Sequence, residues 1–153
     1  MSGSTVRVGR YELMVDRLYD PEHHLWVLPV SDTRVRVGFD PLGVEVNGTL
    51  AQLVLAPLGT VVRRGEAFGS LEAAKFVGPL VAPVSGRVVA QNPVALSNPA
   101  RIEQDPYEEG WLVELETTEL PAERAYLLEG AERIALWFRE RVEAYRREGV
   151  LAE

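Results

Sequence analysis

Short apolar runs, interrupted by Gly, Pro, Asn and Asp, dominate the chain from about Tyr19 to Leu115. Val35-Arg36-Val37 alternates apolar and polar residues, and the turn sequence Asp40-Pro41-Leu42-Gly43 follows it, which is typical of a strand and its turn. The same pattern predicts further strands at 50–55, 61–62, 67–71, 80–82, 87–91 and 111–115, with a loop bracketed by Asn92-Pro93 and Asn98-Pro99. Strands this short, with turns about every eight to twelve residues, predict a small all-β sandwich or barrel.

The last third of the chain has a different periodicity. Pro121 suits the first position of a short helix through Leu128. After Gly130, apolar residues recur at helical spacing, namely Ile134, Phe138, Val142 and Tyr145. We therefore expect C-terminal helices packed on the core, and three parts: an N-terminal extension (1–18), a β-sandwich domain (19–118) and a C-terminal helical segment (119–153).

Composition excludes several classes of function. The chain of 153 residues has 46% apolar residues and a net charge of −7, with no basic run that would bind nucleic acid or an anionic membrane. It contains no cysteine, which excludes a disulfide scaffold, a thiolate metal site and a cysteine nucleophile. The most apolar stretch, Leu50 to Val62, is too short and interrupted for a membrane span, and Met1 to Tyr19 lacks a signal-peptide pattern. We expect a cytoplasmic protein.

Lys75 is the only lysine among 16 basic residues. Lysine offers an amine that can be acylated near neutral pH, whereas arginine does not; codon usage that favours arginine is the alternative explanation. Gly78-Pro79 prevents a helix from extending beyond Val77. The flanking strands instead favour a hairpin with Lys75 near its exposed tip, where an ordinary turn lysine is the alternative interpretation.

The wider pattern around Lys75 resembles the lipoylation segment of glycine cleavage H proteins. Glu72-x-x-Lys75 precedes Pro83-Val84-Ser85-Gly86 as Glu-Ser-Val-Lys precedes Ser-Pro-Val-Ser-Gly in that family. Further matches follow in the family's order: His24-Leu25-Trp26-Val27, Gly59 to Glu66, Asn98-Pro99 and Asp105 to Leu112. The resemblance spans roughly Tyr19 to Leu115.

The chain also departs from the family pattern. Leu25 replaces the acidic residue of His-Glu-Trp, Ala73-Ala74 replaces Ser-Val, and Phe76-Val77-Gly78-Pro79 differs from the usual Ala-Ala-Ser. The last departure, like Glu143 to Arg147, is similar to a branch of H-like lipoate-binding proteins that serve a heterodisulfide-reductase-like pathway of sulfur oxidation. The departures bear on the pathway and leave the carrier role intact.

The resemblance implies a barrel-sandwich hybrid of the lipoyl/biotinyl-carrier type, with lipoate attached covalently to Lys75. It implies a carrier, not an enzyme, that moves an aminomethyl group between glycine decarboxylase, aminomethyltransferase and dihydrolipoamide dehydrogenase, or that serves a heterodisulfide-reductase-like complex. A lipoate-attaching enzyme would recognise the turn through Glu72, and His24 would lie near a groove for the arm, although a structural role for His24 is the alternative. We expect a monomer.

Four other interpretations are weaker. No Gly-x-Ser-x-Gly, phosphate-binding glycine loop or His/Asp/Glu cluster at ligand spacing supports an independent enzyme. An unmodified docking module with the same fold is the second. Biotin is disfavoured because Ala74 and Phe76 flank Lys75 where biotin carriers have methionines. A metal site shared by His23 and His24 is not expected, because adjacent side chains point in different directions.

Overall fold

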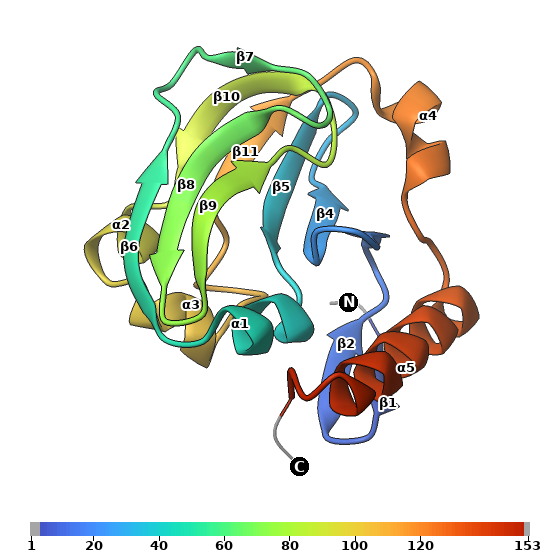
Figure 1. The fold of residues 1–153 in the computed structure, drawn as a ribbon. Coiled ribbons are helices and arrows are strands. Elements are labelled where there is room, and N and C mark those ends of the chain that lie inside the picture. Colours follow the sequence, from blue (N-terminus) through green and yellow to red (C-terminus); the bar gives the residue numbers. More distant parts are fainter. Residues whose placement is uncertain (1–3, 152–153) are drawn as a thin grey trace.

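A computed structural model describes residues 4–151 and shows a β-sandwich with a long C-terminal helix (Figure 1). The strands are β1 (Thr5–Val8), β2 (Tyr11–Met14), β3 (Leu18–Asp20), β4 (Leu25–Pro29), β5 (Arg34–Phe39), β6 (Leu50–Leu55), β7 (Val61–Val62), β8 (Ala67–Ala73), β9 (Phe76–Val81), β10 (Gly86–Gln91) and β11 (Val113–Glu116). The helices are α1 (Pro41–Asn47), α2 (Pro93–Ser97), α3 (Ala100–Gln104), α4 (Leu120–Glu123) and α5 (Ala131–Arg147), with a 3-10 turn η1 (Arg124–Tyr126). No helix in this part of the chain is long and apolar enough to span a membrane.

Two antiparallel sheets form the sandwich. The larger has the order β3-β4-β5-β11-β10-β7, and the smaller has the order β6-β8-β9. A backbone bridge between Tyr19 and Leu128 covers the outer edge of β3. Tyr19 N donates to the Leu128 carbonyl oxygen at an N to O distance of 3.0 Å, and Leu128 N donates to the Tyr19 carbonyl oxygen at 2.8 Å. The predicted all-β sandwich with a helical C-terminus is therefore confirmed.

The core between the two sheets follows from alternation along the strands. In β6, Leu50, Leu53 and Leu55 are buried while their neighbours are exposed. These leucines pack with inward residues of the larger sheet such as Val37 and Leu115. Burial of this apolar surface is the main force that holds the two layers together.

Trp26 requires a glycine on the neighbouring strand. The Trp26 side chain is fully buried, and Gly38 is its partner across β4 and β5. A Cβ at Gly38 would lie 2.3 Å from the indole ring, so only glycine leaves room for it. The indole N–H donates to the backbone carbonyl of Pro106 at 3.2 Å, which satisfies its polar atom in the interior.

A second apolar cluster joins α5 to the hairpin β1–β2. The predicted helical stripe of α5 is buried at Ile134, Phe138 and Val142. Phe138 meets the Tyr11 ring edge-on with centroids 5.3 Å apart. The hairpin belongs to the segment that the sequence suggested only as an extension, and the strands within it were not predicted.

Three helices occur where the sequence predicted no helix. Asp40-Pro41 begins α1, because the Asp40 side chain caps the helix by accepting from Gly43 N and the proline occupies its first turn. Asn92 caps α2 in the same way, so the loop predicted between Asn92-Pro93 and Asn98-Pro99 holds α2, and α3 follows directly after it. The expected helix from Pro121 through Leu128 is wrong in extent: α4 ends at Glu123, and the chain tightens into η1.

Candidate functional site

Lys75 lies at the tip of the hairpin formed by β8 and β9, at the end of the sandwich beside α1 (Figure 1). Ala73 pairs with Phe76, so the turn consists of Ala74 and Lys75 alone. Both turn residues are exposed. The predicted hairpin is therefore present, and the only lysine of the chain stands at its solvent-exposed end.

The tip is fixed by backbone hydrogen bonds to the turn between α1 and β6. Ala74 N donates to the Thr49 carbonyl and Lys75 N to the Asn47 carbonyl, each at 2.9 Å. Gly48, between these acceptors, has a φ of 77°, and a Cβ there would lie 3.3 Å from Lys75 Cγ. Only glycine suits this backbone and this close approach. The turn thus anchors the main chain and leaves the amine unburied.

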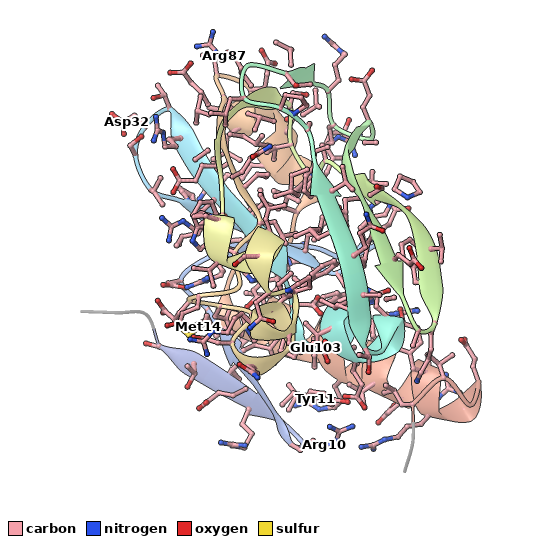
Figure 2. All side chains as sticks on the ribbon, turned by 90° about the vertical axis from the view of Figure 1, so that its left-hand side faces the viewer. Arg10, Tyr11, Met14, Asp32, Arg87 and Glu103 are labelled. Atoms are coloured by element: carbon pink, nitrogen blue, oxygen red, sulfur yellow. The ribbon has the colours of Figure 1, made fainter. Side chains whose placement is uncertain are left out.

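Near the tip, one acidic side chain interacts with the charge of Lys75. Glu45, on α1, pairs with Arg10 at 2.6 Å and accepts from the Tyr11 hydroxyl at 2.8 Å. Burial raises the pKa of the Glu45 carboxyl, but these two partners and the charge of Lys75 outweigh burial and lower it. Figure 2 shows Arg10, Tyr11 and Glu103 at this end of the molecule and Arg87 at the opposite end.

An apolar groove of about 190 Å³ runs beside the hairpin, between β9, α1 and the turn that joins β3 to β4. Phe76, the residue after Lys75, lines it. Its apolar wall also includes Leu25, Phe39, Val46, Leu71, Pro79 and Leu80. A larger hollow, of about 500 Å³, is lined by Val61, Arg63 and Arg87 at the opposite end, so the smaller groove is the one that adjoins the amine.

His24 forms part of the groove wall and is buried. Its Nδ1 lies 3.0 Å from Asp40 Oδ2, and its Nε2 lies 2.7 Å from the Tyr145 hydroxyl on α5. Burial disfavours the imidazolium, but the Asp40 carboxylate and the Tyr145 hydroxyl outweigh it and raise the pKa of His24 to about 9. At neutral pH His24 is a fixed cation whose two N–H groups donate to Asp40 and Tyr145.

The other predicted residue, Glu72, lies elsewhere. It is exposed on β8, where its cross-strand neighbours are Gln52 and Val77, on the outer face of the smaller sheet. The structure therefore places Lys75 next to Phe76 at the groove that His24 also lines, and it places Glu72 outside this groove. Phe76 and the partners of His24 were not found from the sequence, since Asp40 looked like a turn residue and Tyr145 is far away in the chain.

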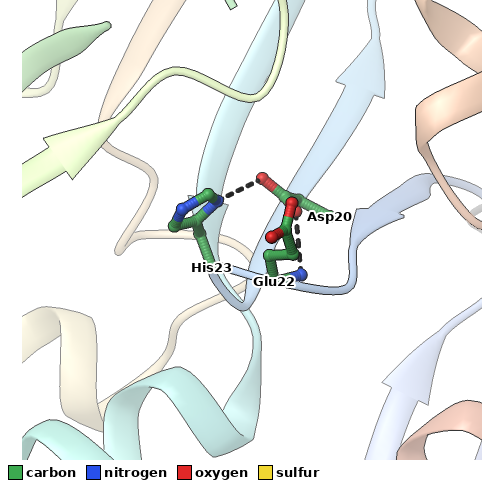
Figure 3. A group of neighbouring side chains, drawn as sticks. All are labelled: Asp20, Glu22 and His23. Carbon is green, nitrogen blue, oxygen red and sulfur yellow. Dashed lines mark hydrogen bonds and ion pairs between the residues drawn. The ribbon is translucent and has the colours of Figure 1, made fainter. Parts of the chain in front are cut away.

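The expectation that the chain has no His/Asp/Glu cluster at ligand spacing is wrong, because such a group lies on the turn between β3 and β4 (Figure 3). Asp20, Glu22 and His23 each offer one atom of a kind that binds metal ions, and these three atoms lie within 4.8 Å of one another. Asp20 accepts from the backbone N of Glu22 at 3.0 Å and lies 3.0 Å from His23 Nδ1. Glu22 and His23 also line the groove. His24 is not part of this group.

The fold and the site together define a carrier protein. A rigid sandwich presents one lysine on a fixed hairpin tip beside an apolar groove, which suits a group tethered to the amine.

Comparison with known proteins identifies the family. The model of the glycine cleavage H-protein family matches residues 17–139. A glycine cleavage system H protein of Corynebacterium jeikeium is 43% identical over 70% of this chain and 86% of its own length, and the H protein 2 of Aquifex aeolicus is 33% identical over 78% and 74%. The crystal structure of the H protein of Mycobacterium marinum superposes with a TM-score of 0.64, at 38% identity over 69% of this chain and 87% of that one. The chain belongs to the glycine cleavage H-protein family.

Membership confirms two predictions. The family fold is a barrel-sandwich hybrid, and its members are carrier proteins that lack catalytic activity. They normally hold a lipoyl-lysine.

Proposed function

We propose that this protein carries a lipoyl group in amide linkage to Lys75 Nζ and shuttles an aminomethyl group between glycine decarboxylase, aminomethyltransferase and dihydrolipoamide dehydrogenase. The observation that carries the proposal is the position of Lys75, exposed at a two-residue turn whose backbone is clamped to the turn after α1. Membership in the family supports these three partners, which are the other proteins of the glycine cleavage system.

The site fits a lipoyl group in size and in chemistry. An arm of about ten bonds reaches about 13 Å, roughly four residues of extended chain. Phe76 lines the groove next to Lys75, so the groove begins well within that reach. When bound, the group supplies the thiol and disulfide chemistry, while the protein supplies an anchor, a shelter and recognition surfaces.

Individual residues of the chain have separate tasks in this proposal. The bonds from Ala74 and Lys75 to the α1–β6 turn hold the anchor still, so that the tethered group samples a bounded volume at high effective concentration. Glu72 is exposed on β8, three residues before Lys75, and is available to a lipoate-attaching enzyme that approaches the outer face of the smaller sheet. His24, held by Asp40 and Tyr145, keeps the groove wall in place.

The test is the intact mass of the protein made in cells supplied with lipoate and a lipoate-attaching enzyme. We expect one lipoyl increment on the wild type and none on Lys75→Arg, which keeps the positive charge but cannot form the amide. A peptide map excludes the N-terminal amine. An unmodified wild type under these conditions would refute the carrier proposal and favour an unmodified docking module.

One observation favours a second pathway for the same carrier. Three residues that depart from the glycine cleavage pattern, Leu25, Phe76 and Pro79, all line the groove and make its wall apolar. Phe76 and Pro79 belong to the stretch that is similar to the H-like lipoate-binding branch, whose members serve a heterodisulfide-reductase-like sulfur pathway. Transfer assays with the glycine cleavage enzymes, run beside a heterodisulfide-reductase-like complex, distinguish the two.

A further inference from the structure

The proposed cargo creates an electrostatic problem in this groove. An aminomethyl group on sulfur ends in a primary amine, which is a cation when protonated. An ammonium taken from water into an apolar groove loses solvation, and it is stable there only with an anionic partner. The inference that follows rests on the proposed function, because it concerns the aminomethyl form of the arm.

Most polar groups of the groove are already committed. His24 is a cation at neutral pH and donates both ring N–H groups to Asp40 and Tyr145. Asp40 is fully buried, and its other oxygen accepts from Gly43 N at 2.8 Å. Leu25, which stands where the family has an acidic residue, is buried in the wall and carries no charge. None of these groups can pair with an incoming ammonium.

Glu22 is the acidic side chain that lines the groove and has no partner there. Among residues 4–151 its carboxylate makes no hydrogen bond or ion pair, although its backbone N donates to Asp20. Asp20 stands beside it but is 8% exposed and already receives the Glu22 N–H and faces the His23 ring. Figure 3 shows the three side chains on one short turn. The carboxylates of Asp20 and Glu22 therefore both lie at this end of the groove.

We propose that Glu22 is the counterion of the amine on the loaded arm and so determines that this groove accepts a cationic cargo. Glu22 is three residues before Leu25, on the turn that forms the same wall, so it restores a negative charge that position 25 lacks. The pair is partly exposed, which limits its strength to that of a surface ion pair.

The test needs no partner enzyme. The lipoylated protein is reduced and incubated with ¹³C-formaldehyde and ammonia, with EDTA present to remove metal ions. One thiol, formaldehyde and ammonia condense: an S–C bond and a C–N bond form, and the carbonyl oxygen leaves as water. The ¹³C signal of the new methylene is then followed by NMR as the pH is raised, which gives the pKa of the bound amine.

Two variants make the comparison specific. Glu22→Gln removes the proposed counterion, and Glu140→Gln removes an equal charge from the exposed face of α5. We expect the pKa of the amine to be lower by about 0.5 in Glu22→Gln, the size expected of an exposed pair, and unchanged in Glu140→Gln. Below that pKa the neutral amine becomes about threefold more abundant in Glu22→Gln. Because its lone pair expels the thiol, formaldehyde release into water should accelerate about threefold.

Each outcome is informative. Equal pKa values and release rates in wild type and Glu22→Gln overturn the assignment of Glu22, and equal shifts in both variants show a general charge effect, which overturns it as well. Lipoylation that fails in the wild type refutes the carrier function itself, and intact mass reveals this before any adduct is made. Near-ultraviolet circular dichroism of each variant verifies that the fold is intact.

Discussion

The contact between Asp40 and His24 predicts a specific dependence of stability on pH. Asp40 is fully buried, lies 3.0 Å from His24 Nδ1 and caps α1 through its other oxygen. Asp40→Asn preserves a side-chain oxygen for the cap but removes the negative charge. The substitution therefore isolates the electrostatic part of the contact from its role at the start of the helix.

The expected magnitude follows from the pKa of His24, which the fold raises from 6.5 to about 9. A pKa that is higher in the folded state stabilises the fold fully below the unfolded value. That stability is lost as the pH rises from about 6.5 through 9. The difference between the two pKa values corresponds to about 3 kcal/mol of unfolding free energy, most of which disappears by pH 9.

Urea unfolding between about pH 6 and pH 9 measures this loss, and NMR of the imidazole nitrogens measures the pKa directly. In Asp40→Asn, burial without a carboxylate lowers the pKa of His24, so the loss in this range should vanish. Tyr145 also faces His24 and Arg141: burial raises its pKa, and Arg141 and His24 outweigh burial and lower it. Tyr145→Phe is therefore measured in parallel. A wild type whose unfolding free energy is constant from pH 6.5 to 9 would refute the proposed role of the Asp40–His24 contact. An Asp40→Asn variant whose unfolding free energy falls as much as that of the wild type would refute it as well.

Three further predictions concern the backbone bonds that hold the hairpin tip, the apolar cluster between α5 and the β1–β2 hairpin, and the groove. Gly48→Ala should lower the free energy of unfolding by about 1–3 kcal/mol, because it forces a side chain into a left-handed backbone conformation. An unchanged melting temperature would contradict the role of Gly48 in holding the hairpin tip. Phe138→Ala should cost about 3–5 kcal/mol in urea unfolding, whereas Leu136→Ala, 56% exposed on the same helix, should cost under about 0.5, and equal costs would disprove the packing of α5. In the lipoylated, reduced protein, Phe76→Ala should expose the thiols to faster alkylation by iodoacetamide, while Val94→Ala, on α2, should not; equal rates would show that the groove does not shelter the arm.

The sequence predicted those features that depend on local patterns. The hairpin at Lys75 followed from the strands around it and from Gly78-Pro79, and α5 followed from the spacing of Ile134, Phe138 and Val142. The start of α1 was missed because Asp-Pro serves equally as a turn and as a capped helix start. The β1–β2 hairpin was missed although Gly9 supplies the positive φ that such a turn needs.

The composition of the site depends on contacts between distant parts of the chain. His24 and Tyr145 are 121 residues apart, and no pattern in either segment indicates that they meet. His24 also adopts a φ of 57°, which is uncommon outside glycine, and only the folded structure reveals it. Glu22 was not singled out from the sequence, and only the fold places it against the groove.

The covered edge of β3 has a consequence for a protein that meets several others in turn. A long strand edge with unpaired N–H and C=O groups pairs with any extended chain it encounters, and aggregation begins in this way. Here Leu128 closes the β3 edge of the larger sheet, and at the other edge β7 offers only Val61 and Val62. An extended chain from another protein therefore finds few free backbone groups with which to pair on this sheet. Contacts that other proteins make through this sheet therefore use side chains, which can be selective and brief.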